Sequence, residues 1–141
     1  MPKTYTQAAI HKMLAAIQFD AQGLVPAIAQ QHDTGEVLMM AYMDRNAVVE
    51  TMSTGRAGYW SRSRKAPWRK GDTSGHIQEL VELRVDCDGD TLLLEVEQTG
   101  VACHTGRHNC FFRAIRDGEL TEIAPVEVDM AKIGTASIGK D

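Results

Sequence analysis

The chain has 141 residues, and 15 Lys and Arg against 19 Asp and Glu give a net charge of −4. This length predicts one domain, and an apolar share of 43% with 24% charged residues excludes a disordered chain. No apolar run is long enough for a transmembrane helix, and the first residues carry no export signal. We therefore expect a cytoplasmic protein without membrane contact, and the negative charge argues against nucleic acid as a partner.

The first half of the sequence predicts a helix, a hairpin and a second helix. Apolar residues at positions 10, 13, 14 and 17 have the spacing of one helix face. Residues 24–29 and 37–43 are strand-like and flank a turn signal at 33–35, so they predict a hairpin. Asp44 is a suitable N-cap for a helix whose inner face holds residues 47, 48 and 52, and Gly55 is a suitable end for it.

The second half predicts further strands. Residues 59–64 alternate as a strand, whereas the polar segment 65–75 predicts a long loop. Two alternating stretches, with Val81, Leu83 and Val85 on one face of the first, surround Asp88-Gly89, and residues 110–115 and 120–123 surround Asp117-Gly118. Both patterns are typical of hairpins. The expected fold is α+β, with a mainly antiparallel sheet and a few helices in one domain over 1–127, followed by a mobile tail over 128–141.

Two thiols and two imidazoles lie within eight residues, and they are the first candidate site. These residues are Cys103, His104, His108 and Cys110. Thiolate and imidazole are preferred zinc ligands, although an isolated cysteine is often only a small buried residue. Cys87 is a third candidate thiolate, and an odd number of cysteines in a chain without an export signal argues against a disulfide framework.

Three carboxylates form the second candidate site. Asp86, Asp88 and Asp90 alternate across one hairpin tip. Oxygen ligands of this kind suit Mg²⁺ or Ca²⁺, and the alternative is a solvated acidic turn. An EF-hand calcium loop has Glu at its twelfth position, and Glu97 is twelfth counted from Asp86. Because Glu97 belongs to an alternating strand, we do not expect an EF-hand.

Residues 56–70 carry six positive charges and no acid, whereas residues 72–97 carry eight acids against one Arg. Arg and Lys bind phosphate, and the aromatic residues 59, 60 and 68 of the same segment can stack on a base. Ser74 and His76 follow closely. These residues favour a phosphorylated aromatic ligand, and the alternative is a solvated basic loop. No P-loop pattern is present.

These motifs together resemble the phosphoribosyl-AMP cyclohydrolase family over about residues 20–113. The resemblance is carried by YWSRSR from Tyr59, WRKG from Trp68, SGH from Ser74, DCDGD from Asp86, and ACHTG from Ala102 with Cys110-Phe111. Pro67, Asp72 and Asn109 stand where the family usually has Leu, Glu and Ser. No helical pyrophosphohydrolase domain follows, so the chain resembles the monofunctional form.

The resemblance implies the third step of histidine biosynthesis, the hydrolytic opening of an adenine ring at its N1–C6 bond. It also implies an intimate homodimer with one zinc per chain, held by Cys103 and Cys110 of one chain and Cys87 of the other. Asp86, Asp88 and Asp90 match the family's magnesium-binding carboxylates. The fourth zinc ligand stays open.

Attack of zinc-activated water on C6 needs a group that moves protons. His104 is the first candidate, because imidazole has a pKa near 6.5, although it can instead be the fourth ligand. His76 and His108 are weaker candidates. Arg62, Arg64, Lys70 and Arg107 are predicted to hold the phosphates, and Trp60, Ser74 and His76 complete the predicted substrate site.

Two alternative functions share features with this hypothesis. The first is a structural zinc module that binds RNA or a phosphorylated ligand through residues 56–70. The second is a zinc nucleoside deaminase, which requires H-x-E and P-C-x-x-C motifs. The chain contains no C-x-x-C, so the deaminase is excluded.

Overall fold

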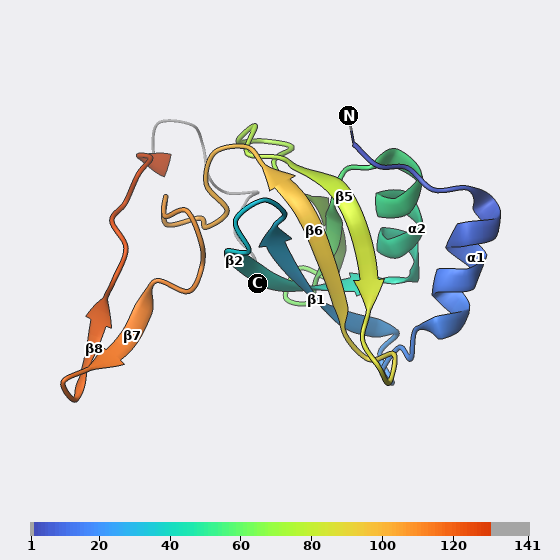
Figure 1. The fold of residues 1–141 in the computed structure, drawn as a ribbon, viewed down its shortest axis with the longest axis horizontal. Helices are drawn as coiled ribbons and strands as arrows, with labels where there is room; N and C mark the ends of the chain where they lie inside the picture. Colours follow the sequence, from blue (N-terminus) through green and yellow to red (C-terminus); the bar gives the residue numbers. More distant parts are fainter. Residues whose placement is uncertain (1, 131–141) are drawn as a thin grey trace.

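A computed structural model describes residues 2–130, which form two helices and two sheets (Figure 1). The larger sheet has six strands in the order β4-β3-β2-β1-β6-β5, and the smaller pairs β7 with β8. In chain order the elements are α1 (Gln7–Ala16), β1 (Leu24–Gln31), β2 (Val37–Asp44), α2 (Arg45–Thr54), β3 (Gly58–Ser61), β4 (Ala66–Arg69), β5 (Gln78–Val85), β6 (Leu92–Gln98), β7 (Arg113–Arg116) and β8 (Glu119–Glu122). No helix in this range is long and apolar enough to cross a membrane.

The predicted α+β class is confirmed, and the sheet is mainly antiparallel. The β1–β2, β5–β6 and β7–β8 hairpins all form as the turn signals predict. The exception is the centre of the large sheet, where β1 runs parallel to β6 and Ala27 lies opposite Leu92. Strands distant in sequence meet at this pair, so the hairpin signals alone do not predict it.

Side-chain and glycine caps mark the ends of the helices, and those of α2 are the residues that the sequence predicts. In α1 the Thr6 hydroxyl accepts a hydrogen bond from the Ala9 amide. In α2 the Asp44 carboxylate accepts one from the Ala47 amide, and Gly55 ends the helix with a left-handed φ of 79°. These contacts satisfy orphan backbone groups at the helix ends.

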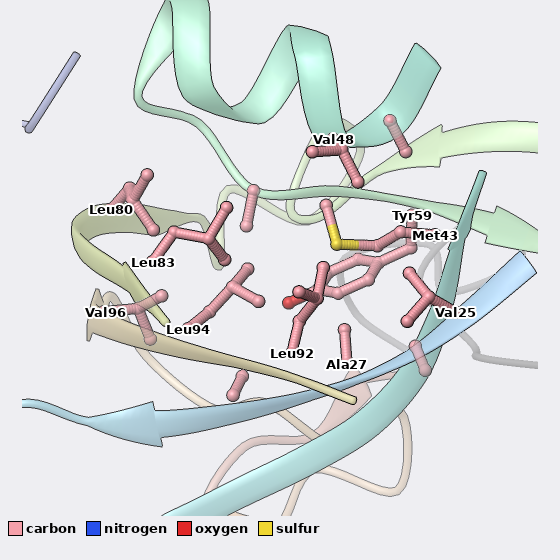
Figure 2. Packing of buried hydrophobic residues seen from close by; sticks show 14 of the residues in the cluster. Val25, Ala27, Met43, Val48, Tyr59, Leu80, Leu83, Leu92, Leu94 and Val96 are labelled. Atoms are coloured by element: carbon pink, nitrogen blue, oxygen red, sulfur yellow. The ribbon is translucent and has the colours of Figure 1, made fainter. Parts of the chain in front are cut away.

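Apolar side chains from the sheet and both helices form one core. Figure 2 shows Val48 of α2 facing Met43, Leu92 and Tyr59 of the sheet, and all four are at most 1% exposed. From α1, Ile10, Leu14 and Ile17 are buried and Met13 is partly buried, as the spacing predicts. The core thus fixes the sheet whose ends carry the candidate sites.

Three predicted features of the large sheet were wrong in detail. The strand expected over residues 59–64 ends at Ser61, and a turn follows it. The segment 65–75 is not one long loop, because Ala66–Arg69 forms strand β4. Pro67 is accommodated because β4 is an edge strand, where a missing N–H breaks no inner hydrogen bond. The expectation that Val81, Leu83 and Val85 share one face of the strand is also wrong, because a bulge between Leu80 and Glu82 leaves Val81 40% exposed.

The β7–β8 hairpin stands away from the large sheet, on the side opposite α1 and α2 (Figure 1). After β8 the chain returns to the segment before β7, where the Glu127 amide donates to the Gly106 carbonyl over 2.8 Å. Met130 is 6% exposed and packs on Val101. The prediction of a mobile tail falls mainly on residues 131–141, which lie outside the described range.

Candidate active site

A tight loop between β6 and β7 presents the first pair of thiols. The Ala102 amide donates to the His108 carbonyl over 3.0 Å, and the Cys103 amide donates to the Arg107 carbonyl over 3.1 Å. At the tip of this thiol loop, residues 102–110, Gly106 has a left-handed φ of 85°. A side chain there would collide with the carbonyl oxygen of Val128, so glycine is required.

The two thiols of this loop interact with each other. Cys103 is 3% exposed, and its Sγ lies 3.0 Å from the Thr105 hydroxyl. A hydrogen bond with Cys110 lowers the pKa of Cys103 from 9.0 to about 5, against the opposing effect of burial, and Thr105 contributes further lowering. Cys103 is therefore disposed to be a thiolate at neutral pH, the form that binds a metal.

Glu36, at the turn before β2, holds the far end of the thiol loop. Its carboxylate oxygens lie 2.8 Å from His108 Nδ1 and 2.6 Å from Asn109 Nδ2. Burial opposes ionisation of Glu36, but these hydrogen bonds outweigh it and lower its pKa. The Cys110 amide also donates to the Leu38 carbonyl over 2.8 Å, so Cys110 is fixed directly on β2.

Lys70 and His76 lie beside the thiols. Lys70 follows β4 and is 0% exposed. Burial lowers its pKa from 10.5 to about 8, while the charges of Cys110 and Cys103 oppose this shift. Burial and the charge of Lys70 both lower the pKa of His76, whose ring packs on Gly100. The structure thus brings Lys70 and His76 to the candidate zinc ligands.

A buried polar network supports this end of the sheet. The Tyr59 hydroxyl donates to Gln78 Oε1 over 2.7 Å, and Gln78 Nε2 donates to Gln98 Oε1 over 2.8 Å. Gln98 Nε2 in turn donates to the carbonyl of His76. Burial raises the pKa of Tyr59, and the charge of Cys110 adds to the effect. The network therefore ties β3, β5 and β6 to the loop that carries His76.

The acidic site lies at the opposite end of β6. One carboxylate oxygen from each of Asp86, Asp88 and Asp90 lies within 4.8 Å of the others. Hydrogen bonds with Asp88 and Asp86 raise the pKa of Asp90, as expected for carboxylates that compete for one region of space. In the same turn Cys87 is exposed. Strand β6, which rises by about 20 Å, lies between Cys87 and the thiol loop along the chain.

The basic residues do not all gather at the thiols. The Arg62 guanidinium stacks on Tyr42 with its carbon 4.0 Å from the ring centroid, and Arg64 Nε donates to the Ser61 hydroxyl over 3.3 Å. Arg107 Nε donates to the Ala124 carbonyl over 3.0 Å, and its NH2 group lies 3.1 Å from Glu122. Arg107 therefore ties the thiol loop to the segment that includes β8.

The remaining predicted substrate residues are divided between two places. Trp60 is half-buried and lines a groove of about 770 Å³ between α2 and the β3–β4 hairpin. Ser74 accepts a hydrogen bond from the His76 amide over 3.1 Å, so it shapes the loop beside the thiols. His104 is exposed at the tip of the thiol loop, and its charge helps to lower the pKa of Cys103.

Several residues of this site carry no signal in the sequence. Glu36 contacts the thiol loop, and Gln98 contacts the carbonyl of His76, only because the large sheet brings distant strands together. Thr105 is different, since a hydroxyl two residues after a candidate thiolate is a local hydrogen-bond donor.

The fold and these side chains place the chain in a recognisable class. It is an α+β protein whose candidate site combines thiols, imidazoles and carboxylates, the groups that metal-assisted hydrolases use. Comparison with known proteins then narrows this class.

The family model described as phosphoribosyl-AMP cyclohydrolase matches residues 39–112. A phosphoribosyl-AMP cyclohydrolase of Rhodospirillum centenum is 68% identical over 123 residues, which cover 87% of this chain and 92% of the relative. The Acidiphilium cryptum protein of the same name is 63% identical over 114 residues, covering 81% and 98%. That of Rhodospirillum rubrum is 56% identical over 136 residues, covering 95% of each chain.

The chain belongs to the phosphoribosyl-AMP cyclohydrolase family. It is an enzyme, a hydrolase of histidine biosynthesis, which confirms the resemblance inferred from the motifs. The monofunctional assignment, the metals and the roles of single residues stay predictions.

Proposed function

We propose that this chain opens the adenine ring of phosphoribosyl-AMP by zinc-assisted hydrolysis of the N1–C6 bond. The observation that carries the proposal is the hydrogen-bonded pair of Cys103 and Cys110, in which the pKa of Cys103 is lowered. The pair lies on a loop that is fixed at both ends. Such a pair suits a soft divalent cation. Family membership supplies the substrate class.

The zinc site is completed, in this proposal, by a second copy of the chain. Cys103 and Cys110 hold the ion, and Cys87 of the partner subunit supplies the third thiolate. The rise of about 20 Å along β6 within one chain supports this division, because a hairpin-tip Cys87 cannot approach its own thiol loop while β6 stays intact. Zinc bound there supplies a water of lowered pKa, close to neutrality.

The exposed apolar surface of the β7–β8 region supports a homodimer. Side chains that are at least 40% exposed there are Phe111, Ile115, Leu120, Ile123 and Val126. A projecting hairpin with this many apolar residues is unusual for an isolated chain. A second copy would cover it and bring Cys87 to the thiol loop in one contact.

The ring-opening chemistry assigns roles to this chain's own side chains. Water adds to C6, the C6–N1 bond breaks, N1 leaves with a proton, and the exocyclic nitrogen remains as a carboxamide. His104, exposed beside Cys103, takes the proton from water and returns it to N1. Arg62 and Arg64 hold phosphate and Trp60 stacks on the substrate.

Magnesium binds at Asp86, Asp88 and Asp90 in this proposal. Their ligand oxygens are already within 4.8 Å of one another, and the lowered pKa of Asp86 favours a charged oxygen there. Burial opposes that shift, but hydrogen bonds from Asp90 and Thr91 exceed it. The cation would neutralise charge near a substrate phosphate.

Turnover of phosphoribosyl-AMP by the purified dimer tests the proposal, with zinc measured in the same sample. We expect one zinc per chain and formation of the aminoimidazole carboxamide product. Cys103→Ala and Cys110→Ala should each abolish zinc binding and product formation. A Cys103→Ala variant that keeps full activity would contradict the proposed role of zinc.

A structural zinc module is the second candidate, favoured by the six positive charges of residues 56–70. It predicts bound zinc, no turnover, and an affinity for RNA that falls steeply with salt. The same turnover assay separates the two, because product formation rules out a purely structural role.

A further inference from the structure

A lysine is buried beside the thiol loop without a hydrogen-bond partner for its ammonium. Lys70 is 0% exposed, and its Nζ contacts no hydrogen-bond acceptor among the described residues. A buried ammonium that lacks a partner costs several kcal/mol in an apolar interior. A lysine side chain normally avoids this cost, because its four-carbon stem can extend to water from most positions.

The backbone around Lys70 is held in place by its neighbours. The Lys70 amide donates to the Ala57 carbonyl over 3.0 Å, and its own carbonyl accepts from Arg56 over 3.3 Å. The chain then turns at Gly71, where a Cβ would lie 2.5 Å from the Ile77 amide nitrogen. The fold thus holds the base of the side chain firmly while directing its charge inward.

Three separate segments deliver the groups that face this charge. Lys70 comes from the end of β4, His76 from the loop before β5, and Cys103 and Cys110 from the thiol loop. The charges of both thiols act on Lys70, and Lys70 acts on His76. Among these groups the two sulfurs are the anionic partners for an ammonium.

We propose that Lys70 is a positioning residue for the metal site, an internal ammonium whose positive charge stabilises the thiolates of Cys103 and Cys110. This inference rests on the proposed zinc function and replaces the predicted phosphate contact, which zero exposure of the side chain argues against. Three thiolates around one divalent zinc leave a net charge of −1, and the ammonium of Lys70 compensates it. Outer groups of this kind orient and tune metal ligands.

Cobalt substitution gives a direct test, because the energy of sulfur-to-cobalt charge transfer depends on the positive charge near the sulfurs. Lys70→Met removes the charge with little change of volume, and Lys70→Gln is a second variant in case methionine does not fold. Lys12→Met, an exposed position on α1, is the matched control. The assay uses the full-length protein with Co²⁺ or Zn²⁺, and a chelator competes for the metal.

We expect Lys70→Met to weaken zinc binding about tenfold and to move the charge-transfer band to longer wavelength. The metal-free variant should melt no lower than the metal-free wild type, because the substitution removes an unpaired buried charge. Lys12→Met should change none of these. An unchanged affinity and band in both Lys70 variants would overturn the inference.

Two further outcomes separate the alternatives. Weaker binding with an unmoved band and a lower melting temperature would indicate a packing role and overturn the inference. A wild-type protein with no sulfur-to-cobalt band would overturn the proposed zinc function and this inference with it.

Discussion

Cys103 makes the native state sensitive to pH at the scale of a single residue. Its pKa is about 5 in the fold against 9.0 for an ordinary thiol, with the hydrogen bond from Cys110 as the main cause. Between these values the unfolded chain binds more protons than the native one. The stabilisation is therefore complete above about pH 9 and lost as the pH falls through 5.

We predict that the metal-free, reduced wild type gains stability between pH 5 and pH 9 more steeply than Cys103→Ser, as measured by urea unfolding. Cys87→Ser is the matched control, since Cys87 is exposed and its removal leaves the Cys103–Cys110 pair intact. Equal slopes for wild type and Cys103→Ser would show that Cys103 is not a native thiolate.

Two glycines of the loop between β4 and β5 allow the effect of backbone strain to be measured apart from the effect of a steric collision. Gly71 and Gly75 have φ values of 87° and 81°, so alanine is strained at both. A Cβ at Gly71 meets the Ile77 backbone, whereas a Cβ at Gly75 meets nothing within 4 Å. We expect Gly75→Ala to cost about 1 kcal/mol and Gly71→Ala about 3 kcal/mol or more in urea unfolding. Similar costs would mean that the loop can rearrange around residue 71.

At the scale of elements, the anchoring of the thiol loop on β2 depends on one carboxylate. Glu36 holds both His108 and Asn109, while the Cys110 amide bonds Leu38. We predict that Glu36→Ala lowers zinc affinity about tenfold, because Cys110 loses its side-chain anchors but keeps its backbone one. Chelator competition measures the effect. Glu82→Ala on the exposed edge strand β5 should bind zinc as the wild type does. A normal affinity for Glu36→Ala would show that the backbone contact suffices.

The elements themselves were largely predictable, because their signals are local. Asp44 and Gly55 fixed the ends of α2, and Asp88-Gly89 fixed a hairpin. Strand β4 was missed because its proline argues against a strand unless its edge position is known. The bulge at Val81 is set by pairing with β6, which no local pattern carries.

The candidate site was predictable in its chemistry and less so in its arrangement. The spacing of Cys103 and Cys110 predicted neighbouring thiols, and the structure brings them into contact. The burial of Lys70 was not predictable, since a basic segment on a loop is normally solvated. Its position follows from β4, Gly71 and the thiol loop meeting in space.

At the scale of the whole molecule, the proposed zinc ligands lie at opposite ends of one strand. The exposed Cys87 lies in the turn before β6, the thiol loop follows the strand, and β6 itself rises by about 20 Å. The proposed symmetric dimer would bring them together, because a two-fold axis places each end of one chain against the other end of its partner. Such a dimer would have two equivalent sites, and each site would use both chains.

Mixed dimers test this arrangement with two inactive chains. Cys87→Ala and Cys103→Ala each lack a ligand at both sites of their own homodimers. In a heterodimer one site lacks both ligands, while the other combines the intact Cys87 of one chain with the intact Cys103 and Cys110 of the other. Random pairing after unfolding and refolding together should therefore restore about a quarter of the wild-type zinc and activity. Cys103→Ala refolded with Cys110→Ala is the control and should restore none, since both lesions lie on the same half of the site. No recovery in the first mixture, with heterodimers shown to form, would place all three thiols on one chain.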